Sequence, residues 1–204
     1  KDYLDSIINY WRVYAGYTEV AADSCEKFLK TIINSKEYPL CRLHSTLASE
    51  TAKVLENSYR ATNIAFIEEW GRFAEDIGVD IFEVVEAIRY RPTHNNIKQP
   101  GFGVGGYCLP KDPLLTSISC RDFFHLNNND FPFSRMAVEI NKKMPLVSLR
   151  KIKTLLGEKL INKRILLFGV SYRSDIGDTR FSPSQIFVEA AIKEGAKVDC
   201  YDPL

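Results

Sequence analysis

Cys108 lies in a stretch whose residue types could support covalent catalysis, GFGVGGYCLPKDP at 101–113. The four glycines within 101–106 allow positive φ values and the close approach of another molecule. Cys108 supplies a soft nucleophile, and Lys111 and Asp112 follow three and four residues later with a cation and a carboxylate. Together these groups predict a thiol that attacks a bound substrate.

Two other interpretations of the stretch must be weighed. Gly101, Gly103 and Gly106 match G-x-G-x-x-G, but a dinucleotide site needs a buried strand before the motif and a helix directly after it. The polar residues 93–100 precede the motif and two prolines follow it, so we reject a dinucleotide site here. A plain loop that holds a buried cysteine stays open, because free cysteine often acts as a small hydrophobic residue.

The composition is that of an ordinary globular protein. The 204 residues are 45% hydrophobic and 26% charged, with a formal net charge of +1. This balance favours neither a nucleic-acid nor a membrane partner. The sequence has no membrane-length apolar run, and we expect its first residues not to be a signal peptide. The five cysteines are scattered without a C-x-x-C pair, so we expect no disulfide framework, no metal site and a reducing cytoplasm.

The elements before the glycines are expected to be mainly helical. A short strand at 11–15 precedes a helix from Thr18, its capping residue, to about residue 33, and 38–43 forms a connector. A long helix should span 46–77, about 32 residues and about 48 Å. A small domain cannot cover that length, so we expect the helix to pack against a second subunit.

Helices are also expected on either side of the cysteine. Their predicted ranges are 81–89, opened by a capping box of Asp80 and Glu83, then 114–126, and then 133–156 as two helices that meet at Pro145. A loop at 127–130 separates the last two ranges. A polar segment, 89–96, leads into the glycines.

The pattern changes after Gly157. A buried strand at 164–170, a helix from Ser182-Pro183 to Gly195 and a strand at 196–201 form one β-α-β unit. One such unit cannot bury both faces of its strands, so we expect the chain to be a piece of a larger protein.

At three places the sequence resembles the UDP-glucose/GDP-mannose dehydrogenase family. Glu50, Lys53 and Asn57 are similar to the family's E-x-x-K-x-x-x-N. Residues 100–113 are similar to its P-G-x-G-x-G-G-x-C-x-x-x-D-P, and 169–183 to its G-x-x-[FY]-K-x-D-x-x-D-T-R-x-S-P. The resemblance extends over essentially the whole chain, and the loop is closer to the N-acetylhexosamine branch.

The resemblance implies a mixed fold. Residues 1–20 would end an N-terminal NAD-binding domain, 21–157 would form an all-α central dimerisation domain with the Cys loop, and 158–204 would begin an α/β, Rossmann-like domain for the nucleotide sugar. The implied partners are the nucleotide-sugar substrate and a second copy of the chain, bound through helix 46–77. NAD would bind mainly outside this chain, so no cofactor-binding residue is assigned.

The resemblance also implies two successive oxidations at C6 of the sugar, from alcohol to carboxylate. Cys108 would form a thiohemiacetal and then a thioester, while Lys53 favours the thiolate and, with Asn57, faces the oxyanion. Asp112 would serve as base or orient water for hydrolysis. The implied substrate-binding residues are Arg91 (with Arg89 as an alternative), Gly101, Phe102, Gly103, Gly105, Gly106, Lys111, Tyr172 and Arg173.

The sequence departs from the family pattern in two places. Arg173 stands where the family usually has a lysine, and Glu68-Glu69 replaces Asn-Glu. Two other functions stay open: a catalytically silent module for dimerisation and sugar-nucleotide binding, and a hydroxyacid or 6-phosphogluconate type of dehydrogenase, which needs no nucleophilic thiol. A cysteine hydrolase would need a histidine base, and no histidine lies in a recognisable motif.

Overall fold

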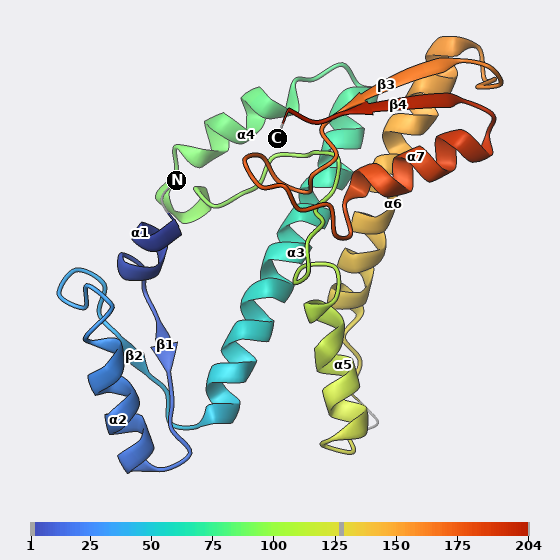
Figure 1. The fold of residues 1–204 in the computed structure, drawn as a ribbon. Helices are drawn as coiled ribbons and strands as arrows, with labels where there is room; N and C mark the ends of the chain where they lie inside the picture. Colours follow the sequence, from blue (N-terminus) through green and yellow to red (C-terminus); the bar gives the residue numbers. More distant parts are fainter. Residues whose placement is uncertain (1–2, 127–128, 204) are drawn as a thin grey trace. The chain divides into compact units, whose positions relative to one another are not determined.

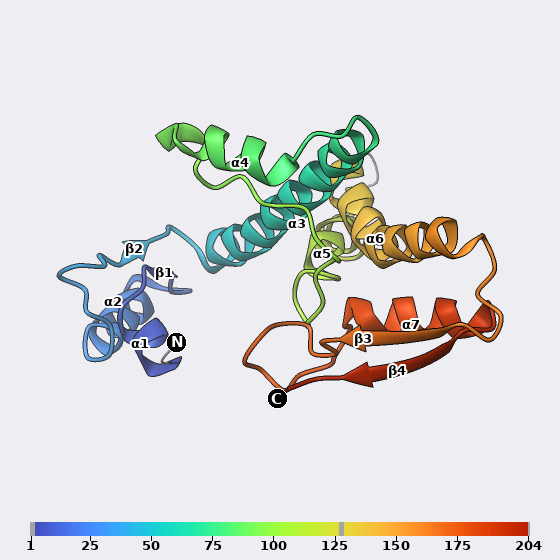
Figure 2. The same cartoon turned by 90° about the horizontal axis from the view of Figure 1, so that it is seen from above.

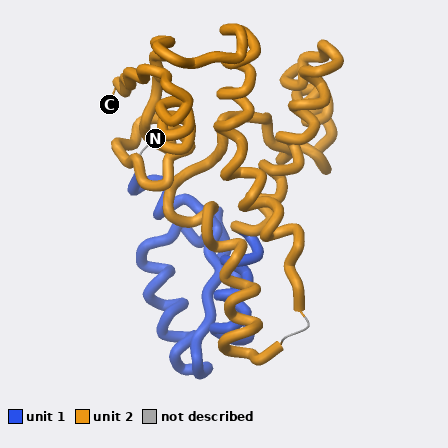
Figure 3. Tube along the Cα trace, turned by 90° about the vertical axis from the view of Figure 1, so that its right-hand side faces the viewer, with its two compact units in different colours: residues 1–56 blue, residues 57–204 orange. Residues whose placement is uncertain are grey.

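The computed structural model describes residues 3–126 and 129–203, and the predicted loop at 127–130 lies partly outside them. The chain divides into two compact units, residues 1–56 and 57–204 (Figure 3). The boundary falls within a single long helix, and each unit is described by itself below.

The first unit contains α1 (Tyr3–Ile8), β1 (Val13–Tyr14), α2 (Glu19–Leu29) and β2 (Cys41–Arg42). Thr18 caps α2 as predicted, because its hydroxyl accepts a 3.1 Å hydrogen bond from the backbone N–H of Ala21. The helix ends at Leu29 rather than near residue 33. The predicted connector at 38–43 contains β2, which pairs in parallel with β1.

The long helix is confirmed as α3 (Thr46–Asp76), and α4 (Ile81–Arg89) follows it. Gly78 takes φ 74°, the left-handed conformation in which glycine commonly ends a helix. Asp80 then caps α4, since its Oδ1 accepts hydrogen bonds from the N–H groups of Phe82 and Glu83. A short 3-10 turn, η1 (Pro92–His94), lies ahead of the glycine loop, which we define as residues 101–106.

Helix α5 (Asp112–Asp122) begins directly after the Cys108 region, and α6 (Pro132–Leu156) follows. The prediction of two helices meeting at Pro145 is wrong, because α6 runs continuously through this proline. Proline has no N–H and therefore leaves the carbonyl of Asn141 without its usual helical donor. Gly157 ends α6 with φ 83°.

The C-terminal part is the predicted β-α-β unit, made of β3 (Arg164–Phe168), α7 (Pro183–Lys193) and β4 (Lys197–Tyr201). The two strands pair in parallel, with Arg164 opposite Lys197 and Phe168 opposite Tyr201. Helix α7 lies between α6 and the strand pair (Figure 1 and Figure 2). The buried core of this region is formed by Leu149, Leu160, Phe187, Ala191 and Ala196.

The predicted fold class is confirmed, since a helical part with one long helix precedes a parallel β-α-β unit. The domain boundaries after residues 20 and 157 stay predictions. Among the described residues, no helix has the length and apolarity needed to cross a bilayer, and no group of histidine, cysteine and carboxylate side chains could hold a metal ion.

Candidate active site

Cys108 is exposed and lies immediately ahead of α5. Its carbonyl accepts hydrogen bonds from the backbone N–H groups of Lys111 (3.1 Å) and Asp112 (2.8 Å), so the chain turns into the helix directly after the cysteine. The next side chain, Leu109, packs against a cluster of small buried residues, Ala61 and Ala65 of α3 and Ala137 of α6. The structure therefore presents Cys108 at the surface, while the neighbouring Leu109 is partly buried against the helices.

A buried polar pair connects α3 to the start of α5. Asn57, only 1% exposed, donates an Nδ2 hydrogen bond of 2.7 Å to Oδ2 of Asp112, which is 8% exposed. The other carboxylate oxygen of Asp112 accepts a 2.7 Å bond from the ammonium of Lys111. The structure thus brings together three residues that the sequence had assigned to the site, two of them far apart along the chain.

Lys111 contacts both Asp112 of the buried pair and Tyr107, the residue before Cys108. Its Nζ lies 4.5 Å from the centroid of the Tyr107 ring, a distance at which a cation is attracted to an aromatic face. The hydrogen bond to Asp112 raises the pKa of Lys111, with smaller contributions from the charges of Tyr107 and Cys108. Lys111 is therefore held as a cation close to the Tyr107 ring, next to Cys108 in the sequence.

Lys53 belongs to the first unit, whereas Cys108 belongs to the second. The ammonium of Lys53 lies 3.6 Å from the Glu56 carboxylate, and both side chains are exposed. Its role beside the thiol stays a prediction.

The end of the glycine loop packs against the segment that follows β3. The N–H of Gly106 donates a 2.9 Å hydrogen bond to the carbonyl of Arg180. A β-carbon on Gly106 would lie 2.9 Å from the Tyr172 ring, and one on Gly105 would lie 2.4 Å from the carbonyl oxygen of Phe181. Glycine is required at both positions because any larger residue would collide with this segment.

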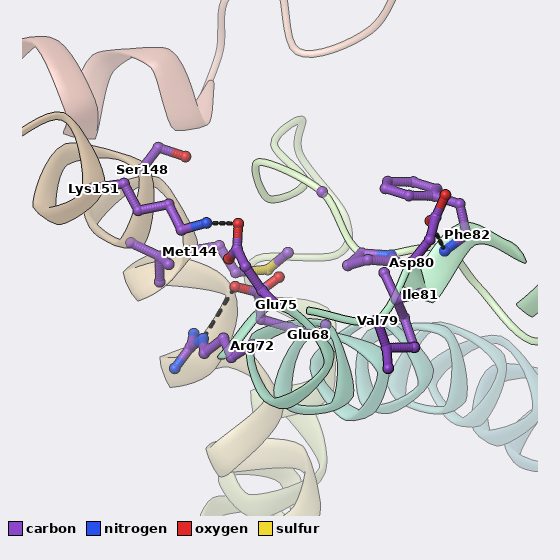
Figure 4. A pocket seen from close by; sticks show the side chains of 14 residues that line it. Glu68, Arg72, Glu75, Val79, Asp80, Ile81, Phe82, Met144, Ser148 and Lys151 are labelled. Atoms are coloured by element: carbon purple, nitrogen blue, oxygen red, sulfur yellow. Dashed lines mark hydrogen bonds and ion pairs between the residues drawn. The ribbon is translucent and has the colours of Figure 1, made fainter. Parts of the chain in front are cut away.

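The start of the loop is held by α3. Glu68, 5% exposed, accepts a hydrogen bond from the backbone of Gly101, and its Oε1 also accepts a 3.2 Å bond from Nε of Arg72. Burial raises the pKa of Glu68, and its two hydrogen bonds oppose that shift. Both side chains border a pocket of about 420 Å³ behind Pro100 and Gly101, where Lys151 also pairs with Glu75 (Figure 4).

Phe102 and the arginines at 89 and 91 are the next predicted binding residues. The Phe102 side chain packs on the core, with its ring 5.7 Å from that of Phe187, so its contact with a sugar stays a prediction. Arg89, the alternative to Arg91, already binds the carbonyl of Ile97 and the carboxylate of Glu86. Arg91 is exposed at the start of η1.

Tyr172 and Arg173 follow β3 in a turn held by Asp202. The Asp202 carboxylate accepts hydrogen bonds from the N–H groups of Val170 (2.7 Å) and Ser171 (2.8 Å). Tyr172 packs on the glycine loop, whereas Arg173 is exposed. Both are thus placed near the carboxyl end of a parallel strand, the usual position of ligand sites in α/β sheets.

Sequence reasoning missed four residues that hold this site: Glu68, Asn141, Arg180 and Asp202. Asn141 has a detectable signal, because it stands four residues ahead of a proline inside a helix. Asp202 follows a strand, a common place for a ligand-loop residue. Arg180 lies in the D-T-R part of the motif at 169–183, and Glu68 had been noted only as a departure from the family pattern, so neither was given a role.

The glycine loop lacks the flanks of a dinucleotide site in the described structure. Residues 95–100 form no strand, and α5 begins only at Asp112. The described structure therefore lacks both flanks that the dinucleotide motif requires.

Comparisons with known proteins agree with this geometry. Residues 47–143 match the model of the UDP-glucose/GDP-mannose dehydrogenase family, central domain. The UDP-N-acetyl-D-mannosamine dehydrogenase of Methanocaldococcus jannaschii is 35% identical over 199 residues, which cover 98% of this chain and 43% of that protein. The chain therefore spans less than half the length of this relative.

Solved structures give the same result. The UDP-D-ManNAc dehydrogenase of Pyrococcus horikoshii has a TM-score of 0.81 and 31% identity, over 98% of this chain and 46% of that one. The NDP-N-acetyl-D-galactosaminuronic acid dehydrogenase of Methanosarcina mazei Go1 has a TM-score of 0.83 at 22% identity, over 98% and 43% of the two chains, and shows the fold alone. This chain thus belongs to the UDP-glucose/GDP-mannose dehydrogenase family, whose central domain it carries at residues 47–143.

Proposed function

We propose that this chain is the cysteine-bearing part of an enzyme that oxidises a UDP-N-acetylhexosamine at C6, from alcohol through aldehyde to carboxylate. The observation that carries the proposal is the exposed Cys108 four residues ahead of Asp112, whose buried carboxylate is held by Asn57 and Lys111. The choice of substrate class is supported by the names of the relatives, which act on UDP-N-acetyl-D-mannosamine.

The covalent step belongs to Cys108. Its sulfur adds to the aldehyde carbon, and the carbon–sulfur bond that forms is broken by water after the adduct has been oxidised to a thioester. NAD would supply the hydride acceptor for both oxidations. Water attack releases the carboxylate and returns the thiolate, so the cysteine is unchanged over the cycle.

Asp112 is suited to orient the attacking water. Each carboxylate oxygen accepts one of the bonds described above, and an ionised carboxylate has further lone pairs for a water hydrogen. Asn57 has a second N–H that can face the oxyanion. Both residues are rigidly placed because they are buried and bonded to each other.

The cation that favours the thiolate is assigned to Lys53, with Lys111 as the alternative that the local geometry supports. Lys111 is next to the cysteine loop and remains charged through its bond to Asp112. Replacing each lysine by methionine distinguishes them, since only loss of the active cation should move the pH dependence of aldehyde oxidation upward.

A second function is proposed for the chain by itself: a catalytically silent module that binds the nucleotide sugar. It is favoured by the flanks of the glycine loop, which do not suit a dinucleotide. Thermal shift of the isolated chain with UDP-N-acetylhexosamines, alongside an NAD reduction assay, would distinguish binding from turnover.

The thioester is tested by Cys108→Ser in the enzyme that contains this chain. We expect the variant to carry out some first oxidation but to release almost no acid, because an oxygen ester hydrolyses far more slowly than a thioester. Mass spectrometry should then detect a sugar adduct on the serine. Cys200→Ser, also at an exposed cysteine, is the control and should release acid normally. Release of acid by Cys108→Ser at the wild-type rate would exclude the nucleophile role.

A further inference from the structure

The glycine loop (101–106) is held at three backbone positions by groups outside it. Glu68 of α3 accepts a bond from Gly101, Asn141 of α6 binds Val104, and the carbonyl of Arg180 accepts from Gly106. These three backbone positions, 101, 104 and 106, are three and two positions apart along the chain. The loop is therefore supported along its whole length, although it contains four glycines.

Of these three contacts, only that of Asn141 pairs both the N–H and the carbonyl of one loop residue, Val104, in the described structure. Its Oδ1 accepts a 2.8 Å hydrogen bond from the N–H of Val104, and its Nδ2 donates a 2.8 Å bond to the carbonyl of Val104. A primary amide carries a donor and an acceptor side by side, which a carboxylate or a hydroxyl cannot reproduce in this arrangement. The half-buried Asn141 side chain thus bonds the backbone of Val104 at both its N–H and its carbonyl, as the backbone of a neighbouring strand would.

The backbone of Asn141 takes part as well. Pro145 leaves the Asn141 carbonyl without its helical donor, and Gly103 approaches this oxygen so closely that a β-carbon would lie 3.3 Å from it. The same β-carbon would lie 3.3 Å from the ring of Pro183 at the start of α7. Gly103, with φ 108°, is therefore seated between two helices at the point where Asn141 binds its neighbour.

We propose that Asn141 is a positioning residue for the aldehyde oxidation assigned to Cys108, a role that rests on the function proposed above. Val104 stands four residues before the cysteine, and the chain between them is held again at Gly106. Fixing Val104 therefore fixes the register in which the chain reaches Cys108. Asn141 acts only through the backbone and touches no reacting atom.

The role makes a selective prediction about the two oxidations. The first, from alcohol to aldehyde, does not use the thiol, whereas the second requires the sulfur to lie within reach of the aldehyde carbon. Misplacing a reacting group by about 1 Å can cost about 100-fold in rate. Loss of Asn141 should therefore reduce the second oxidation far more than the first.

The test uses the enzyme that contains this chain, with UDP-N-acetylmannosamine and with its 6-aldehyde supplied directly. Asn141→Ala is expected to lower kcat for the aldehyde about 10- to 100-fold, to leave KM within about twofold and to release free aldehyde from the alcohol substrate. Asn141→Asp keeps the shape but sets an oxygen against the Val104 carbonyl, and should behave similarly. Lys142→Ala, exposed and adjacent on α6, is the control.

Hydrogen exchange of this chain provides a measurement independent of activity. In Asn141→Ala and Asn141→Asp, protection should be lost at residues 103–106 and retained in α6. Retained protection, or an equal fall of both oxidations in Asn141→Asp, would overturn the positioning role while leaving the proposed function intact. An inactive wild-type enzyme would overturn the proposed function, and this role with it.

Discussion

Asn57 of α3 and Asp112 of α5 form a buried hydrogen bond of 2.7 Å between two helices that are far apart in sequence. A buried carboxylate that loses a donor retains its desolvation penalty, which is roughly 1–3 kcal/mol for a typical polar group. The bond therefore matters for stability as well as for the proposed hydrolysis.

We expect Asn57→Ala to lower the free energy of unfolding by roughly 1–3 kcal/mol. Chemical denaturation of this chain measures the loss. Asn96→Ala is the matched control, because it removes a 2.6 Å hydrogen bond to Tyr59 that is exposed, and it should change stability by no more than about 0.5 kcal/mol. Equal losses in the two variants would show that the buried Asn57–Asp112 bond contributes no more to the free energy of unfolding than the exposed one.

Gly106 permits a test of the contact between the glycine loop and Tyr172. Gly106→Ala places a β-carbon 2.9 Å from the Tyr172 ring at φ 79°, so we expect a loss of roughly 1–3 kcal/mol. Gly101→Ala meets no atom within 4 Å and keeps its N–H, so it should be almost neutral. Thermal denaturation of both variants decides the matter, and a neutral Gly106→Ala would contradict the packing.

Glu68 predicts a pH-dependent stability. Burial raises its pKa in the folded chain, so the unfolded chain loses this proton first as the pH rises. The contribution of Glu68 is thus fully present below its unfolded pKa and is lost as the pH rises through the folded pKa.

Glu68→Gln cannot lose a proton and should gain stability relative to wild type as the pH rises from 4 to 7. Melting temperatures measured across this range report the difference. Glu69→Gln, an exposed neighbour with the same change of charge, should show no such trend. A melting-temperature difference for Glu68→Gln that stays constant or falls with pH would contradict the prediction.

Local capping signals account for much of the fold that could be predicted from sequence. Thr18, Asp80 and Ser182 each cap a helix with a side-chain oxygen, and Gly157 ends one in the left-handed conformation. These signals depend on residues within one turn, so a single sequence contains them. The long helix was equally clear, because proline is absent from it and its apolar residues recur at helical spacing.

The errors came from interactions between distant residues. The two-residue strand β2, predicted only as part of a connector, has no periodic pattern of its own and exists because β1 lies beside it. Pro145 stays within α6 for reasons of packing that only the fold reveals. The candidate site divides in the same way: its cysteine and carboxylate were found from motifs, whereas the Asn141 and Glu68 contacts with the loop were not.

Helix α3 predicts self-association. Its residues Phe66, Trp70 and Phe73 are spaced to share one face and are each about half exposed in the described structure, with the Trp70 ring 6.3 Å from Phe66 and 6.0 Å from Phe73. We expect the chain to sediment as a homodimer, at twice 23.3 kDa, at tens of micromolar. Trp70→Glu should dissociate it, whereas Phe133→Glu, at an exposed aromatic on α6, should not. A monomeric wild type would exclude the dimer.

Arg173 is proposed to bind the diphosphate of the nucleotide sugar. It follows β3 in the turn that Asp202 holds. An exposed guanidinium at the carboxyl end of a parallel strand is well suited to a charge-assisted bond with phosphate oxygens.

Arg173→Ala should weaken UDP-N-acetylhexosamine binding by roughly 1–3 kcal/mol, which is about 5- to 150-fold in KM or in the dissociation constant. Arg173→Lys keeps the charge but not the two-pronged geometry, so it should lie between Arg173→Ala and wild type. Arg164→Ala provides the control, since this exposed arginine lies at the opposite end of the same strand and pairs with Asp199. Because a diphosphate contact is electrostatic, the wild-type advantage over Arg173→Ala should also shrink as salt is raised. Equal affinity of Arg173→Ala and wild type in titration calorimetry at low salt would remove Arg173 from the site.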